Sequence, residues 1–257
     1  MKLTPSDFFP PLFARGWRKL FRGPVATGPV DRRKIHPFDA VPAGLEPKLI
    51  LDVGANQGDV SIAAAKSYPG ARIVCFEPVS ATYRRLAERM APYRDRCELH
   101  ALALSDREGE AEIHLTTAHG ANSLEAQAEF HKKINPKVRE LSTETIRLAT
   151  LDSIRPQLPP GGIDLIKIDV EGHEMKVLRG GERTFRDSVD TLLIEVSLQR
   201  DASWEAQAFL EMFQLLSGWG FRLVNLYDVY HATAEQHFGS MLVTQFDCVW
   251  RHKRHLS

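Results

Sequence analysis

The chain has 257 residues, of which 43% are hydrophobic, and its 33 basic and 33 acidic residues give a formal net charge of zero. This length suits one α/β domain with a sizeable core. A protein without net charge has no overall electrostatic attraction to nucleic acid, so no nucleic-acid partner is expected. The 3 cysteines are too few and too widely spaced for a disulfide framework or a zinc knuckle, which favours a reducing, cytoplasmic compartment.

Residues 1–47 are predicted to form an N-terminal arm that mixes aromatic and basic side chains and is broken by 8 prolines. Two interpretations stay open. Either the arm packs its aromatic side chains on the domain, or a short amphipathic helix over residues 12–22 makes peripheral contact with an anionic membrane surface or a partner. No apolar run reaches the ~20 residues that a transmembrane helix needs.

From residue 48 onward, apolar runs and amphipathic segments alternate, which predicts strands and helices in turn. Strands are predicted at residues 49–53, 71–76, 98–104, 111–115, 146–151, 163–170, 191–196, 221–226 and 243–250. Helices are predicted at residues 60–66, 80–90, from 175 and 205–216, with a short one near 124–133 inside a polar insertion at 117–145. The alternation predicts a doubly wound, mostly parallel sheet with helices on both faces, whose ligands bind beyond the carboxyl ends of the strands.

The turn after the first predicted strand reads Asp52-Val53-Gly54-Ala55-Asn56-Gln57-Gly58. Its glycines allow a tight turn and a close approach of a ligand to the backbone. A dinucleotide-binding fingerprint would have glycines at 54, 56 and 59, but Asn56 and Asp59 stand there, which disfavours a nicotinamide oxidoreductase. The acidic Asp52 suits a ligand with an ammonium group, such as a methionine moiety, although the loop alone is also compatible with a purely structural turn.

A second acidic residue, Glu77, follows the predicted strand at residues 71–76, and Pro78 ends that strand. A carboxylate in this place can accept hydrogen bonds from both ribose hydroxyls of a nucleoside. The loop and this carboxylate together predict a nucleoside-containing ligand.

Four segments together resemble the FkbM family of methyltransferases over about residues 48–200. These segments are the loop at 52–58, Phe76-Glu77-Pro78, Ala103-Leu104-Ser105-Asp106, and Ile166-Lys167-Ile168-Asp169-Val170-Glu171-Gly172-His173-Glu174. The resemblance implies a class I methyltransferase (Rossmann-like) fold. It also implies S-adenosylmethionine as the methyl donor and hydroxyl groups of sugars or natural products as acceptors.

The same resemblance implies where the donor binds. The methionine part would lie against Asp52, Gly54, Ala55, Asn56 and Gly58, the ribose against Glu77, and the adenine against Leu102 and Ala103. Family members often carry Asn where this chain has Ala101, and Asp106 is the expected substitute. Asp169, close to the sulfonium, is a further expected cofactor contact.

Methyl transfer is an in-line displacement, and removal of the acceptor's proton assists the attack. Lys167 shares a strand face with Asp169 and can pair with it or with Glu195 on the next strand. We predict that Asp169, His173, Glu171 and Lys167 carry the chemistry, with His173 or a carboxylate as the base. Asn122, Ser123, Glu174 and Glu195 are predicted to bind the acceptor, and the insertion at 117–145 to cover it.

Plainer interpretations of the same residues stay open: an acidic helix start favoured by the helix dipole, a solvent-facing His173, and an ordinary surface insertion. Carboxylates also suit Mg²⁺, but we predict no metal site. The sequence thus predicts a methyltransferase domain over residues 48–257 that methylates a hydroxyl of a glycan, glycolipid or small natural product. Methylation of nitrogen in a small molecule and a non-catalytic binding module are the alternatives.

Overall fold

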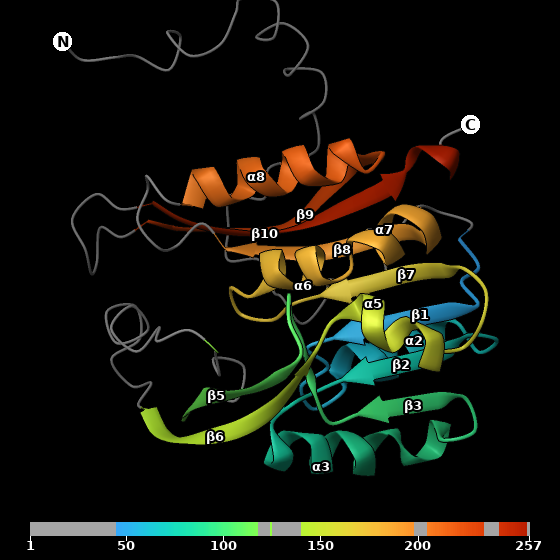
Figure 1. Ribbon diagram of the computed structural model, residues 1–257, viewed down its shortest axis with the longest axis vertical. Coiled ribbons are helices and arrows are strands. Elements are labelled where there is room, and N and C mark those ends of the chain that lie inside the picture. The colour runs from blue at the N-terminus through green and yellow to red at the C-terminus, as the bar shows by residue number, and fades with distance from the viewer. Residues whose placement is uncertain (1–44, 118–123, 125–139, 198–204, 234–241, 256–257) are drawn as a thin grey trace, which may run out of the picture. The chain divides into compact units, whose positions relative to one another are not determined.

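The computed structural model describes residues 45–117, 124, 140–197, 205–233 and 242–255. Residues 1–44 of the N-terminal arm, Asn122, Ser123 and most of the helix expected near 124–133 lie outside the described residues. Two sheets are present in the described part of the chain (Figure 1). The larger has seven strands in the order β3-β2-β1-β7-β8-β10-β9. These are β1 (Leu49–Val53), β2 (Arg72–Phe76), β3 (Cys97–His100), β7 (Ile163–Ile168), β8 (Val189–Ser197), β9 (Phe221–Thr233) and β10 (Leu242–His252).

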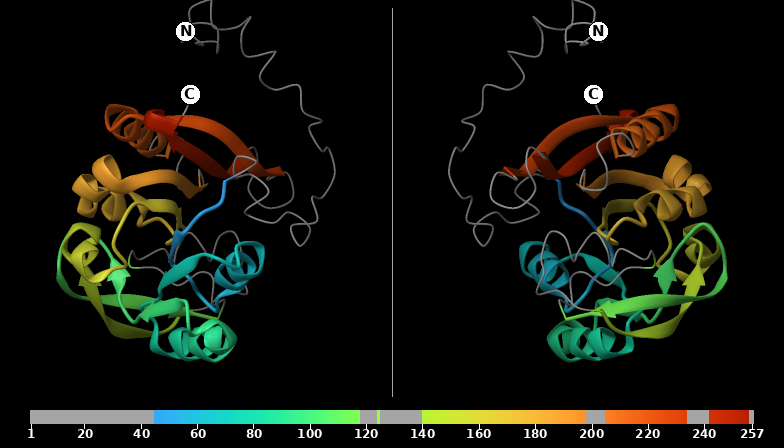
Figure 2. Two further views of the ribbon diagram at one scale, coloured as in Figure 1. Left: turned by 90° about the vertical axis from the view of Figure 1, so that its right-hand side faces the viewer. Right: turned by 90° about the vertical axis from the view of Figure 1, so that its left-hand side faces the viewer.

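Helices cover both faces of the larger sheet. They are α2 (Asp59–Ser67), α3 (Ser80–Met90), α5 (Leu151–Ile154), α6 (Glu174–Gly180), α7 (Glu182–Ser188) and α8 (Glu205–Gly218). Helices α5 to α8 lie on one side of the sheet, and α2 and α3 on the other (Figure 2). Every residue of β1 is buried, because a parallel strand between two helical layers has no solvent face. The predicted doubly wound, mostly parallel sheet is confirmed.

Strands β1, β2, β3, β7 and β8 run parallel, whereas β10 pairs antiparallel with both β8 and β9. The sheet grows from β1 in both directions. The chain adds β2 and β3 on one side of β1 and later adds β7 and β8 on the other side. A crevice opens at such a switch point, outside the carboxyl ends of the two strands. The turns after β1 and β7 therefore flank the place where a ligand is expected.

The smaller sheet corrects several boundaries. It has the order β4-β6-β5, with β4 (Ala103–Leu104), β5 (Gly109–Thr116) and β6 (Glu140–Ala149). The single strand predicted at 98–104 is wrong, because the chain leaves the larger sheet after His100 and Ala103 then pairs with Leu148. The segment at 111–115 pairs antiparallel with β6 in this sheet.

Strand β6 extends into the insertion that was expected to be irregular. Its polar stretch at 140–145 hydrogen-bonds to β5, while Ile146 and Leu148 pack with Val79 and Ile113 in a small apolar cluster. The strand ends before Leu151, contrary to the prediction, because the Thr150 side chain accepts a hydrogen bond from the Ser153 backbone N–H and so caps α5.

No helix in the described part of the chain combines the length and apolar character that a membrane crossing needs. All 3 cysteines are free thiols. Cys75 on β2 and Cys97 on β3 are far apart in the sequence, but their sulfur atoms lie 3.8 Å apart because the two strands are neighbours.

Candidate active site

A cavity of about 410 Å³ opens at the carboxyl ends of β1, β2 and β7. Its wall is built from the turns that follow these strands and from parts of the smaller sheet. The lining comprises residues 53–57, 59–60, 76–79, 102–104, 113, 124, 167, 169–171 and 173. All four segments that carry the family resemblance therefore contribute residues to one cavity, as expected of turns along one sheet edge.

The turn after β1 lies directly on the turn after β7. Gly54 has φ +81°, and a Cβ added there would lie 1.9 Å from the carbonyl oxygen of Asp169. The Gly54 and Ala55 backbone N–H groups both donate to the carbonyl oxygen of Phe76, at 3.0 Å each. Glycine is thus required at position 54 by its backbone conformation and by the close packing of the turn after β1 on the turn after β7.

Glu77 is held firmly at the end of β2. It is 6% exposed, and its two carboxylate oxygens accept hydrogen bonds from the backbone N–H groups of Asn56 and Val79, at 3.0 and 2.9 Å. Burial raises the pKa of Glu77 to about 7, although both backbone hydrogen bonds act in the opposite direction. Each carboxylate oxygen retains a second lone pair, so the side chain can still accept a hydrogen bond from a ligand in the cavity.

Asp52 lies behind the cavity wall and not in it. It is 2% exposed, accepts a short hydrogen bond from the Ser61 hydroxyl, and approaches the Lys167 ammonium at 3.9 Å. Burial raises its pKa, and the charge of Lys167 opposes that shift. The direct ligand contact expected of Asp52 does not fit this position, which balances a buried lysine instead. Gly58, also outside the lining, begins α2 with φ 85°.

The other end of the cavity is apolar. Leu102 and Ala103 line it, as expected for an adenine site, and Val79, Ile113 and Leu124 complete the wall. These last three were not predicted, because nothing in the sequence indicates that the smaller sheet folds back on the end of β2. Asp106, the expected substitute for a family asparagine, is exposed and does not line the cavity.

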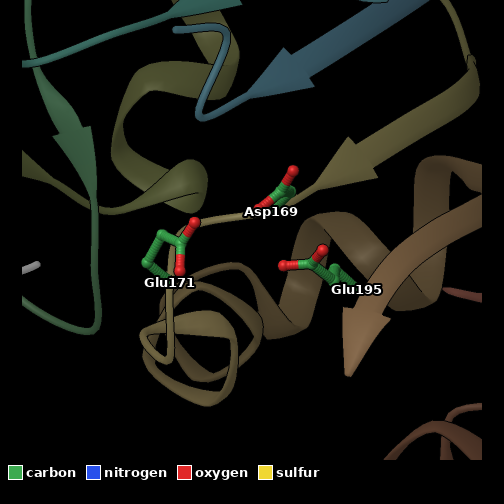
Figure 3. Close-up of side chains that lie close together, drawn as sticks. All are labelled: Asp169, Glu171 and Glu195. Carbon is green, nitrogen blue, oxygen red and sulfur yellow. The ribbon is translucent and has the colours of Figure 1, made fainter. Parts of the chain in front are cut away.

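A cluster of acidic side chains lies at the ends of β7 and β8 (Figure 3). Oxygen atoms of Asp169, Glu171 and Glu195 all lie within 4.8 Å of one another. The Lys167 ammonium donates a hydrogen bond to Asp169 Oδ2 at 2.8 Å, which is the first of the two pairings expected for this lysine. Asp169 and Glu171 line the cavity, so this cluster presents carboxylates to it.

The pKa values within this cluster diverge. Burial alone would raise the pKa of Asp169, but the charge and hydrogen bond of Lys167 outweigh it, with help from a hydrogen bond to Glu195, and lower that pKa. Burial and the charges of Asp169 and Glu171 raise the pKa of Glu195 well above its ordinary value. Burial lowers the pKa of Lys167, but Asp169 and Asp52 reverse that effect and raise it.

His173 is buried, so the solvent-facing alternative is wrong. It is 5% exposed, and its Nε2 lies 2.9 Å from the hydroxyl oxygen of Ser105, which is 1% exposed. This contact ties the turn after β4 to the turn after β7. His173 also lines the cavity, with its Nε2 beside the Ser105 hydroxyl.

Glu174, expected to bind the acceptor, instead closes its own turn. One of its carboxylate oxygens accepts hydrogen bonds from the backbone N–H groups of Val170 and Gly172, both at 3.1 Å, and the residue does not line the cavity. The cluster of Asp169, Glu171 and Glu195 is compact enough for a hard cation. The absence of a metal from this cluster stays a prediction.

The Methyltransferase FkbM domain family matches residues 52–223, which is more than half of the chain. The chain belongs to this family. Residues 52–223 therefore form a methyltransferase FkbM domain with the class I, Rossmann-like fold, a class whose general methyl donor is S-adenosylmethionine.

Similar proteins include the AMB antimetabolite synthetase AmbE of Pseudomonas aeruginosa, which is 29% identical over 189 residues. The match covers 62% of this chain and 9% of AmbE. The 2-O-methyltransferase NoeI of Sinorhizobium fredii is 32% identical over 143 residues, and the match covers 53% of this chain and 58% of NoeI. The chain thus spans less than two thirds of these two relatives. The methyltransferase FkbM structure from Methylobacillus flagellatus KT covers 80% of this chain and 44% of its own, with a TM-score of 0.47 and 16% identity.

In this FkbM family member, the cavity gathers most of the residues that the sequence singles out. Gly54, Ala55, Asn56, Glu77, Leu102, Ala103, Lys167, Asp169, Glu171 and His173 line it, whereas Asp52, Gly58, Asp106, Glu174 and Glu195 do not. Asp52, Glu174 and Glu195 lie against neighbours that strand periodicity does not reveal, whereas Asp106 is exposed.

Proposed function

We propose that this chain is an S-adenosylmethionine-dependent O-methyltransferase that acts on a hydroxyl group of a sugar, glycan, glycolipid or small natural product. One observation carries the proposal: Glu77, at the end of β2, and Asp169, after β7, line the same cavity. A carboxylate suited to ribose and a carboxylate suited to an acceptor hydroxyl therefore face one space. Transfer of a group between two bound molecules requires such proximity.

The residues around the first turn fit the donor. Asn56 Oδ1 is buried and has no hydrogen-bond partner within the described residues, and Glu77 has lone pairs to spare. These oxygens can accept hydrogen bonds from the ammonium group and the ribose hydroxyls of S-adenosylmethionine. The apolar wall at Leu102, Ile113 and Leu124 suits the faces of an adenine ring.

S-adenosylmethionine supplies a methyl group whose bond to sulfur breaks, leaving the electron pair on sulfur, as the bond to the acceptor oxygen forms. Asp169 accepts a hydrogen bond from the acceptor hydroxyl and takes up its proton. The hydroxyl becomes strongly acidic as its oxygen bonds to carbon, so a carboxylate of lowered pKa suffices as the base. Lys167 keeps Asp169 ionised and oriented before the reaction.

Oxygen is the favoured acceptor atom for two reasons. The relative NoeI is named as a 2-O-methyltransferase, and a carboxylate beside the reacting atom suits a hydroxyl donor. The acceptor is expected to be a small molecule or glycan that enters at the ends of β7 and β8.

Methyl incorporation tests the proposal. Purified protein would be incubated with S-adenosylmethionine carrying an isotopically labelled methyl group and with panels of sugars, glycolipids, phenols and amines. We expect label on a hydroxyl oxygen, and its loss with Asp169→Asn. Label on nitrogen would support the small-molecule N-methyltransferase alternative. Binding of S-adenosylmethionine with no incorporation across all panels would favour a non-catalytic binding module.

A further inference from the structure

The acidic cluster contains a direct contact between two carboxyl groups. Strands β7 and β8 are parallel neighbours with Ile168 opposite Ile194, so Asp169 and Glu195 each follow their strand partner by one residue. Their side chains lie close together at the sheet edge (Figure 3). Oxygen atoms of the Asp169 and Glu195 carboxyl groups lie within 4.8 Å of one another.

A hydrogen bond between two carboxyl groups requires a proton, because an ionised carboxylate can only accept. The surroundings decide which group holds it. The Lys167 ammonium bonds directly to Asp169 at 2.8 Å, which stabilises the charged form of Asp169. Glu195 instead faces Asp169 and Glu171, and Asp247 lies opposite it on β10. Two ionised groups at this separation would repel strongly.

We propose that Glu195 is a positioning residue, a neutral carboxylic acid that donates a hydrogen bond to Asp169 and fixes its carboxylate toward the acceptor. This inference rests on the proposed function, in which Asp169 meets the acceptor hydroxyl. Lys167 and Glu195 hold Asp169 from two strands, so its remaining lone pairs face the cavity. Glu195 itself touches neither donor nor acceptor, since it does not line the cavity.

The protonation of Glu195 sets an upper pH limit for turnover. Four charged groups surround the pair of Asp169 and Glu195. Lys167 bonds to Asp169 and interacts in turn with Asp52 on β1. Glu171, in the turn after β7, and Asp247, on β10, interact with Glu195. Burial and the neighbouring carboxylates raise the pKa of Glu195. As the pH rises through this pKa, Glu195 loses its proton, the hydrogen bond to Asp169 is lost and repulsion displaces the carboxylate. Turnover is therefore expected to fall on the alkaline side.

The protonation state can be measured without any acceptor. The full chain would be labelled with ¹³C at the glutamate side-chain carboxyl groups, and the Glu195 signal assigned by its absence in Glu195→Gln. We expect this signal to remain that of a neutral acid at neutral pH and to titrate well above the ordinary range of a glutamate, about 4.3. In Asp169→Asn, which lacks the neighbouring negative charge, the pKa of Glu195 should move toward the ordinary range of a glutamate. Titration of the wild-type signal in the ordinary range would overturn the inference.

Turnover with an acceptor found by methyl incorporation gives the second test. Glu195→Gln keeps a neutral hydrogen-bond donor, so it should retain turnover to within about threefold and lose the alkaline fall. Glu195→Leu has similar bulk and no donor, and it should lower kcat about 10- to 100-fold, as expected for a lost hydrogen bond to a charged group. S-adenosylmethionine affinity should change little in both. Equal loss of kcat in the two variants would contradict the positioning role.

Asp247→Asn is the matched control, because it removes a charge that faces Glu195 without touching the cavity. It should keep the plateau rate and shift the alkaline fall to lower pH. An unmoved alkaline limb would contradict the assignment of that limb to Glu195. If the carbon spectra show a neutral Glu195 but no acceptor is ever methylated, the proposed function fails while the carboxyl pair stands.

Discussion

At the scale of single residues, Glu77 has the most informative environment in the cavity. Its pKa is raised to about 7 by burial, whereas ribose hydroxyls donate to the ionised form. Binding therefore favours loss of its proton, and affinity for S-adenosylmethionine should fall by up to about tenfold per pH unit as the pH drops below about 7. Calorimetric titration over a pH series would measure this. Glu77→Gln should give a flat profile, and a flat wild-type profile would contradict the ribose role.

Asp169 carries the second prediction at this scale. Asp169→Asn keeps the shape of the side chain but removes the base, so kcat should fall roughly 10²–10⁴-fold. Cofactor affinity should survive largely intact, because the ribose and adenine contacts lie on other strands. Steady-state kinetics and calorimetry on the same preparation separate the two effects. Near-normal turnover would exclude the Asp169 cluster from the chemistry.

At the scale of elements, the contact between the turns after β1 and β7 holds the site together. Gly54→Ala combines a positive φ with a Cβ that would lie 1.9 Å from the Asp169 carbonyl oxygen. We expect a loss of roughly 2–5 kcal/mol in the free energy of unfolding, from backbone strain and overpacking together. Chemical denaturation would measure it. Gly70→Ala is the control, since nothing lies within 4 Å of its added Cβ, and equal stability of the two variants would show that the close contact is unimportant.

The same elements explain what the sequence predicts and what it does not. Buried parallel strands such as β1 are continuous apolar runs, so their positions and the turns after them could be predicted. Strand β4 is only two residues long and pairs with β6, more than forty positions further on, so local pattern carried no signal for it. The burial of Asp52 against Ser61 and the contact of Glu195 with Asp169 depend on strand order, which periodicity does not give.

At the scale of the whole molecule, the family match covers residues 52–223, and the arm predicted at residues 1–47 lies outside it. Deleting residues 1–35 should leave the affinity for S-adenosylmethionine unchanged, because every described residue of the cavity lies between positions 53 and 173. Calorimetry on the shortened chain would test this, with thermal unfolding to confirm that it is folded. Abolished affinity in a folded deletion variant would show that the arm contributes to the donor site. Binding of anionic liposomes by the full chain alone would support the membrane interpretation of the arm.

The central claim is that the cavity at the ends of β1, β2 and β7 is a S-adenosylmethionine site built on Glu77. Calorimetric titration of the donor into wild type, Glu77→Ala and Glu98→Ala tests it most directly. Glu98 is the matched control, because it pairs with Arg72 on the sheet edge outside the cavity lining. We predict that Glu77→Ala weakens binding by roughly 1.5–3 kcal/mol, as for lost hydrogen bonds to a charged group, while Glu98→Ala and wild type bind alike and NAD does not bind. Unchanged affinity in a folded Glu77→Ala protein would contradict the account.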